Sequence, residues 1–406
     1  MNNLSVNLIP IAGFINKATR ILAVFYLLSV SEPESFSIWA TIALILQYSF
    51  YLQLGVPFSM TREISIAVGE DNQSKKDLIV STSTINLIFA SIILYFLLGF
   101  FGPSYLFIYI FLYLTISHAS ALFINQSRSK FNNYAVIAAF LIESLIIVFG
   151  IFFYFNQNEP LLSFIFVLSL AAFFNCIICF PYKEISNIFK SSIGEIYRVE
   201  KQLLGFGLPL LLFSVILLFC TTWDLIVIQY ISPSLYVSYS SVFFFGNSVK
   251  IFGALVGMMF LPIMAREFGR SGTISSVILM QKFREYRAYI FYSFLLFLLF
   301  FYPALTFLTK TILNEYQHLN NIIMFRTTAI FLGLLAIPYL HLFNTLRKTR
   351  LSIFIILTST LFALFLATLC LSFLPFDVSF VIAHLFSSLL MLALCIFHLN
   401  KLNEKS

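Results

Sequence analysis

Charged residues are scarce in this sequence. Asp, Glu, Lys and Arg make up 10% of its 406 residues, whereas a soluble domain carries about 25%. Apolar residues make up 60% of the chain, and the mean hydropathy is +0.96. This composition excludes a soluble enzyme, a disordered chain and a secreted disulfide scaffold. It also argues against a transmembrane β-barrel, whose strands alternate polar and apolar residues. We therefore expect an all-α polytopic membrane protein.

Motifs for metal, cofactor or nucleotide chemistry are also few. The five cysteines lie inside apolar runs, and Cys176 and Cys179 form a CxxC without a second Cys or His pair nearby, so we expect no metal or redox site. The histidines lack ligand spacing, which favours structural roles. No GxxxxGK[ST] motif is present, so ATP hydrolysis is not expected. The first apolar run contains basic residues and no cleavage site follows it, which argues against a signal peptide.

Long apolar runs dominate the rest of the chain. A helix needs roughly 20 apolar residues to cross a bilayer, and 60% of 406 residues gives about 244 of them. Hydropathy therefore predicts about twelve transmembrane helices. They cover residues 6–30, 35–56, 78–101, 104–125, 134–155, 161–181, 205–230, 236–262, 288–309, 323–346, 351–373 and 377–398.

Basic residues gather in alternate connections between these spans. Of the 24 Lys and Arg, 19 fall in 57–77, 126–133, 182–204, 263–287, 347–350 and 399–406. The opposite set of connections carries a single one, Lys310. Because basic loops stay in the cytoplasm, we expect the first set and both chain termini to be cytoplasmic. The net charge of +7 is thus a topology signal and does not indicate a nucleic-acid partner.

The two halves of the chain resemble each other. Trp39 follows Ser31-Glu32-Pro33 and Tyr239 follows Ser232-Pro233, 200 residues later, and Pro57 and Pro262 end equivalent spans. Six spans per half give a parallel repeat about an axis along the membrane normal. We expect two six-helix lobes around a central cavity. The domains would be an N-lobe at 1–181, a cytoplasmic amphipathic linker at 182–204 and a C-lobe at 205–406.

Six ionisable residues lie inside the predicted spans, where each costs roughly 2.5–3.5 kcal/mol to insert. Lys17 and Arg20 are spaced i, i+3 on one face of the first span, with Asn16 beside them. Lys250 lies near the middle of the eighth span, one turn after Asn247. Cations from both lobes would make the cavity a site for an anion.

The other three residues leave structural pairing open. Glu143 and Asp224 are acids within the fifth and seventh spans, and either could neutralise a nearby cation or exchange a coupling ion. Arg326 is near the outer end of the tenth span, where we expect it to reach the headgroups.

Several segments resemble a known group of transporters. They are Gly13 to Arg20, Gly55-Val56-Pro57, Arg62-Glu63, Gly205-Phe206-Gly207-Leu208-Pro209, Trp223-Asp224 and Leu261-Pro262. The chain resembles the multidrug/oligosaccharidyl-lipid/polysaccharide (MOP) exporter superfamily, and within it the Wzx-type O-antigen flippases. Their motifs are diffuse but cover nearly the whole chain.

This resemblance implies a function. Such flippases move undecaprenyl-pyrophosphate-linked oligosaccharides across the bacterial inner membrane by alternating access, without ATP, and some are coupled to a proton or sodium gradient. Lys17, Arg20 and Lys250 match helices that hold the pyrophosphate in relatives, and Asn16 and Asn247 would line the cavity. Glu143 and Asp224 are the candidates for ion coupling. Expected partners are the lipid-linked oligosaccharide, membrane lipids, an O-antigen polymerase and a chain-length regulator.

The sequence also allows other functions. The substrate could be another lipid-linked polymer, such as a capsule or teichoic-acid repeat. A MATE-type small-molecule exporter of the same superfamily is a second alternative, although a cationic cavity has the wrong sign for cationic drugs. A membrane glycan polymerase is less favoured, because such enzymes carry a large outer loop and the longest one here, at 310–322, has about 13 residues.

Overall fold

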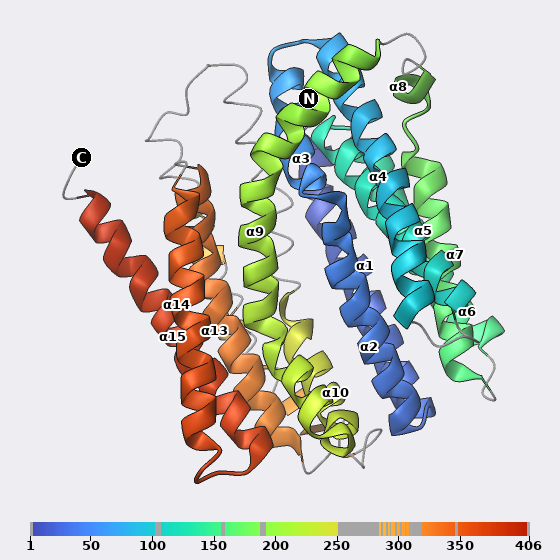
Figure 1. Ribbon diagram of the computed structural model, residues 1–406. Helices are drawn as coiled ribbons and strands as arrows, with labels where there is room; N and C mark the ends of the chain where they lie inside the picture. The colour runs from blue at the N-terminus through green and yellow to red at the C-terminus, as the bar shows by residue number, and fades with distance from the viewer. Residues whose placement is uncertain are drawn as a thin grey trace. The chain divides into compact units, whose positions relative to one another are not determined.

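The computed structural model describes residues 3–101, 107–155, 159–186, 192–250, 319–345 and 348–403, with scattered positions between 284 and 310. Every regular element in these ranges is a helix (Figure 1). The all-helical fold class expected from the composition is therefore confirmed. Residues 263–283 of the connection at 263–287, and the repeat residues Leu261 and Pro262, lie outside the described residues.

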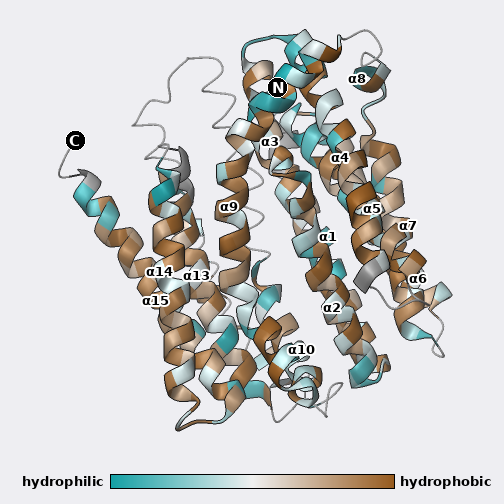
Figure 2. Cartoon of the chain, in the orientation of Figure 1, coloured by the Kyte–Doolittle hydropathy of each residue, from teal (hydrophilic) through white to brown (hydrophobic). Residues whose placement is uncertain are grey.

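Ten of the described helices are long and apolar enough to cross a membrane, judged by length and composition. Each coincides with one of the twelve predicted spans, and the eighth and ninth spans are described only in part. Figure 2 shows hydrophobic residues along most of their length. The ten are α1 (Asn3–Val30), α2 (Pro33–Ser49) with its 3-10 turn η1 (Phe50–Gln53), α4 (Gln73–Phe101), α5 (Phe107–Ser129), α6 (Asn133–Tyr154), α7 (Pro160–Cys179), α9 (Ile193–Ile231), α13 (Asn320–Thr345), α14 (Thr349–Cys370) and α15 (Phe376–Asn403). The chain is a multi-pass membrane protein.

The remaining described helices are short. They are α3 (Val56–Gly69), α8 (Tyr182–Ser186) and α10 (Pro233–Ser248). Proline stands in the first turn of α3 and α10, where its missing N–H leaves no helix hydrogen bond unmade. α10 forms the described part of the predicted eighth span.

The chain divides into two compact units. The first contains the described residues of 1–31 and 41–211, and the second contains 32–40, 212–250 and the described residues beyond 284. In the first unit α7 packs against α5 and α6, and α1 lies along α6. In the second unit α13 packs against α10 and α15, and α14 lies along α15.

The core of the first unit draws on seven of the described helices, α1, α3, α4, α5, α6, α7 and α9. Each contributes apolar side chains with almost no exposed surface, which stabilises the unit through burial and close packing. Examples are Met60 of α3, Val80 of α4, Leu122 of α5, Val136 of α6 and Leu203 of α9. The first part of α9 therefore belongs to this core.

The helix α9 differs from the expected linker. The sequence suggested a separate amphipathic helix at 182–204 and a new span from 205. The structure instead has the short α8 and then one continuous helix of 39 residues, from Ile193 to Ile231. Gly205 and Pro209 suggested a helix start, but proline is tolerated within a membrane helix when its neighbours satisfy the freed backbone groups. Along the chain, the boundary between the two units falls within α9, after Leu211.

A close backbone approach fastens α9 to the first unit. Gly55 has φ +81°, in the left-handed region that favours glycine. A Cβ on Gly207 would lie 2.6 Å from the Gly55 carbonyl oxygen, and one on Gly55 would lie 2.3 Å from the Gly207 oxygen. Either contact is too short for any side chain. Nearby, Arg62 stacks over the Phe206 ring at 5.3 Å.

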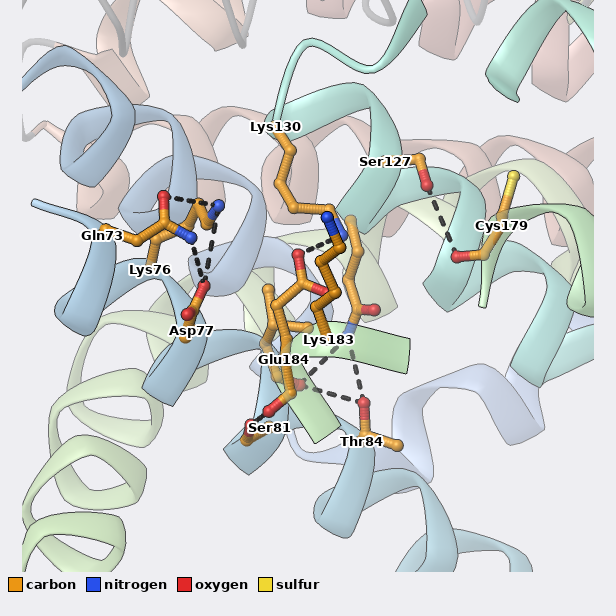
Figure 3. Close-up of polar contacts among 12 residues, drawn as sticks. Gln73, Lys76, Asp77, Ser81, Thr84, Ser127, Lys130, Cys179, Lys183 and Glu184 are labelled. Carbon is orange, nitrogen blue, oxygen red and sulfur yellow. Dashed lines mark hydrogen bonds and ion pairs between the residues drawn. The ribbon is translucent and has the colours of Figure 1, made fainter. Parts of the chain in front are cut away.

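Polar contacts tie α8 to its neighbours (Figure 3). Lys130, just after α5, donates to the Glu184 carboxylate at 2.8 Å, and Ser81 of α4 donates to the Glu184 carbonyl at 2.8 Å. Burial alone would raise the pKa of Glu184, but the hydrogen bond and charge of Lys130 outweigh it and lower that pKa. Lys130, one of the basic residues in the connection at 126–133, therefore also has a structural role as the partner of Glu184.

Candidate functional site

The polar face of α1 is directed towards α6. Asn16 is 5% exposed and donates its side-chain amide to the Phe140 carbonyl at 3.2 Å. This bond fixes the rotation of α1 against α6. Since residues three or four apart share a helix face, Lys17 and Arg20 follow Asn16 to the same region, as the sequence predicted.

Arg20 forms an ion pair with Glu143. Both its Nε and its Nη2 contact Glu143 Oε1. The second carboxylate oxygen accepts from the Asn175 amide at 2.5 Å. Glu143 is 1% exposed, whereas the Arg20 side chain is 38% exposed. Glu143 thus lies inside the unit with both oxygens satisfied, and its structural pairing with a cation, left open by the sequence, is what the structure shows.

Lys17 has a different environment. It is partly buried and forms no hydrogen bond or ion pair with any residue in the described ranges. The charged groups close enough to act on it are Arg20, Glu143 and Arg128. These four side chains carry three formal positive charges and one negative charge. Arg128 was not singled out from the sequence, because it stood in a connection whose basic residues were explained by topology.

The second unit contains the remaining predicted site residues. Lys250 donates to the Thr221 hydroxyl at 3.0 Å. The side-chain oxygen of Asn247 is buried without a hydrogen-bond partner in the described part of the chain. Lys250 therefore lies against α9 within its own unit. Whether it shares a cavity with Lys17 and Arg20 stays a prediction.

Asp224 is the centre of a buried polar network in the second unit. It forms an ion pair with Arg326 and accepts from the Tyr239 hydroxyl at 2.7 Å. Arg326 also donates to Tyr239 at 3.0 Å and stacks over the Phe243 ring at 4.9 Å. His384 Nε2 lies 3.3 Å from the carboxylate. The network joins α9, α10, α13 and α15.

The expectation that Arg326 reaches the headgroups is wrong. The side chain is 0% exposed, as is that of Asp224. Position near a helix end suggested snorkelling, but a carboxylate on a neighbouring helix compensates the charge more fully than partial hydration does. Gly246 makes room for it, because a Cβ there would lie 3.0 Å from two Arg326 side-chain carbons.

Both intramembrane acids are thus held by arginine. Ion coupling through Glu143 or Asp224 stays a prediction, and protonation of either acid would remove the negative charge that its arginine pairs with. Among the residues that the structure describes, no group of three or more His, Cys, Asp or Glu residues could hold a metal ion.

Comparisons with known proteins place the fold. No protein-family model matches the sequence, and no curated protein sequence matches it. Solved structures do match. The Vibrio cholerae MATE transporter VcmN is 14% identical, with a TM-score of 0.66 over 98% of this chain and 99% of that one. A multidrug resistance MATE transporter of the MOP superfamily, in an outward-facing conformation, is 13% identical with a TM-score of 0.67 over 98% and 96%. A MATE structure in the straight conformation is 12% identical with a TM-score of 0.66. At these identities the likeness shows a common fold.

Proposed function

We propose that this chain is a transporter that flips an undecaprenyl-pyrophosphate-linked oligosaccharide, of the O-antigen type, across the bacterial inner membrane by alternating access. The fold supports a transporter, since the similar solved structures are transporters. The observation that carries the choice of substrate is the excess of positive charge around Lys17. A pyrophosphate lipid is an anion that needs such compensation to enter a site of low dielectric constant.

We propose Lys17 and Arg20 of the first unit as pyrophosphate-binding residues, and the same role for Lys250 of the second unit stays a prediction from the sequence. Lys17 supports the proposal most directly, because no described residue neutralises it. Arg20 has part of its charge matched by Glu143. Among the described residues the hydrogen-bond partner of Lys250 is the Thr221 hydroxyl, which does not neutralise its charge.

Export of small molecules is the second candidate, favoured by the multidrug transporter among the similar structures. The two candidates differ in the sign of the charge that the site must bind. A cationic drug requires an excess of carboxylates, whereas the described part of the first unit has the opposite balance around Lys17. A flippase for capsule or teichoic-acid repeats would use the same anion chemistry.

The test is restoration of O-antigen in a flippase-deleted strain, read as the ladder of lipopolysaccharide on a gel. We expect the wild-type chain to restore the ladder, Lys17→Ala to reduce it at least tenfold, and Lys17→Glu to abolish it through like-charge repulsion of the pyrophosphate. Lys75→Ala is the control, because Lys75 is a surface cation paired with Glu70. Protection against cationic drugs without any ladder would instead establish the exporter.

A further inference from the structure

Arg20 lies in the middle of the membrane-spanning part of α1. That part runs from Leu8 to Val30, so at about 1.5 Å per residue Arg20 is at least about 15 Å from either end, which is farther than its side chain reaches. The side chain is nevertheless 38% exposed. A charged group at this depth faces the interior of the protein or a water-filled cavity and not the lipid. The exposed part of Arg20 is therefore open to a polar ligand and not to headgroups.

Glu143 contacts one edge of the Arg20 guanidinium. Nε and Nη2, which lie on the same edge, both contact Glu143 Oε1. The guanidinium is a planar group with N–H donors on more than one edge, and the edge formed by Nη1 and Nη2 can also bind an oxyanion through two parallel hydrogen bonds. Nη1 forms no hydrogen bond with any residue in the described ranges. Within that part of the chain, the second edge of the guanidinium has no acceptor.

Asn175 holds Glu143 from the other side. α6 packs against both α1 and α7, and the side-chain amide of Asn175, on α7, donates to Glu143 Oε2 at 2.5 Å. Asn175 is 0% exposed, and its Oδ1 is buried without a partner among the described residues. A buried acceptor without a partner costs free energy that an apolar side chain would avoid. The interaction that favours an amide at this position is therefore its hydrogen bond to the carboxylate.

We propose that Glu143 and Asn175 are positioning residues, which hold the Arg20 guanidinium by one edge and present its other edge to a phosphate group of the lipid-linked substrate. The inference rests on the proposed function and adds to it the residues that orient Arg20. Asn175 fixes the carboxylate, and the carboxylate fixes the guanidinium. The remaining Nη1 and Nη2 donors then match two oxygens of one phosphate. Because Glu143 balances the charge of Arg20, Lys17 supplies the positive charge of the site and Arg20 supplies directed hydrogen bonds.

A purely structural ion pair is the competing explanation. Asp224 and Arg326 in the second unit are such a pair, since both side chains are 0% exposed and further groups of the protein bind the guanidinium. Arg20 differs, because its side chain is partly exposed and has one partner among the described residues. A structural role predicts that loss of the Asn175 amide affects binding in the same way whatever residue stands at position 20. A positioning role predicts an effect that requires the arginine.

The experiment is a double-mutant cycle on the binding of farnesyl pyrophosphate to the purified full-length protein in phosphatidylcholine nanodiscs. Asn175→Leu removes the amide without changing any charge. Arg20→Lys keeps the positive charge but has no planar fork to orient. We expect Asn175→Leu to weaken binding about tenfold when Arg20 is present. In the Arg20→Lys background it should weaken binding less than about twofold, because the two residues act through one interaction.

Three controls accompany the cycle. Ser144→Ala should bind like wild type in both backgrounds, because the buried Ser144 hydroxyl, next to Glu143, donates to the Phe140 carbonyl of its own helix. Farnesol measures the contribution of the apolar tail alone. Nanodiscs with added phosphatidylglycerol test whether headgroup phosphates occupy the site, and we expect them to compete little.

Two kinds of result overturn the inference and separate it from the proposed function. If Asn175→Leu weakens binding equally in both backgrounds, or in neither, Asn175 is structural, while a preference of the wild-type protein for farnesyl pyrophosphate over farnesol leaves the function standing. Strong competition by phosphatidylglycerol would likewise assign the free edge of Arg20 to headgroups. If the wild-type protein binds farnesyl pyrophosphate no better than farnesol, both the inference and the function fail.

A second variant keeps the test decisive if Asn175→Leu aggregates. Glu143→Leu removes the negative charge beside Arg20 and also the group that orients it. If charge alone governs binding, this variant should bind farnesyl pyrophosphate more tightly than wild type, because a repulsive charge is gone. If Glu143 positions Arg20, the variant should bind more weakly. Tighter binding by Glu143→Leu would therefore overturn the inference.

Discussion

Hydrogen bonds around Asp224 and Arg326 offset the free-energy cost of burying this ion pair in the second unit. Burying two charges costs several kcal/mol per ion, and their attraction offsets this only with further hydrogen bonds. Tyr239 supplies such bonds to both partners. The Thr221 carbonyl accepts from Arg326 at 3.4 Å as well. The two charges therefore compensate each other. Removal of either one alone would leave the other buried without a counter-ion and would destabilise the protein.

We expect Asp224→Ala to destabilise the protein by about 3–5 kcal/mol, because it leaves the Arg326 guanidinium buried without its counter-ion. Combining Asp224→Leu with Arg326→Met should recover much of that loss, since both charges are then gone. The measurement is thermal unfolding in detergent, with Glu34→Ala, an exposed acid of the same unit, as the control. A single variant as stable as wild type would mean that Arg326 is hydrated.

At the scale of whole helices, α9 meets the start of α3 through a close backbone contact within the first unit. Leu54 and Gly55 both have positive φ, so the chain leaves the 3-10 turn η1 and enters α3 with a sharp break. Gly207 allows α9 to contact that break through backbone atoms alone. Gln202 also donates to Glu63 of α3 at 3.3 Å, and Asn86 of α4 donates to Glu200 at 3.1 Å.

Gly207→Ala is expected to destabilise the first unit by about 1–3 kcal/mol, the usual cost of forcing a methyl group into a closely packed contact. Its Cβ would lie 2.6 Å from the carbonyl oxygen of Gly55, so the two elements must separate. Gly205→Ala serves as the control, because a Cβ there meets nothing within 4 Å. Equal melting temperatures for the two variants would contradict this contact.

At the scale of the whole molecule, the alternation of basic connections remains the argument for orientation. The helices themselves do not indicate which side of the membrane they begin on. Positive residues are translocated reluctantly, so the side with 19 of the 24 Lys and Arg is expected to stay in the cytoplasm. Two exposed residues mark the two sides. Asp71, between α3 and α4, lies in a connection that is expected to be cytoplasmic, and Glu32, between α1 and α2, lies in one that is expected on the opposite side.

A single cysteine introduced at each of these two positions tests the orientation, in a background without the five native cysteines. Glu32→Cys should react with a membrane-impermeant maleimide added to intact spheroplasts, and Asp71→Cys should react only after the membrane is disrupted. Because both side chains are exposed, a lack of reaction reports the side of the membrane and not burial. Labelling of Asp71→Cys in intact spheroplasts would reverse the topology.

The sequence by itself determined the class of fold and ten of the spans. Membrane helices are readable from sequence because each must bury its own backbone hydrogen bonds and present about 20 apolar residues, which are properties of one continuous segment. It also placed Lys17 and Arg20 on one helix face with Asn16, since that follows from the helical period alone.

Only the tertiary structure decided which charges are paired. Pairing depends on how each helix is rotated about its axis and on which neighbours it meets, and an almost uniformly apolar span carries little signal of either. For this reason the sequence left the roles of Glu143 and Asp224 open and placed Arg326 at the headgroups, whereas the structure pairs Glu143 with Arg20 and buries Arg326 against Asp224. The buried Nε of Arg128 also lacks a partner among the described residues, and a missing partner is likewise a property of three-dimensional contacts.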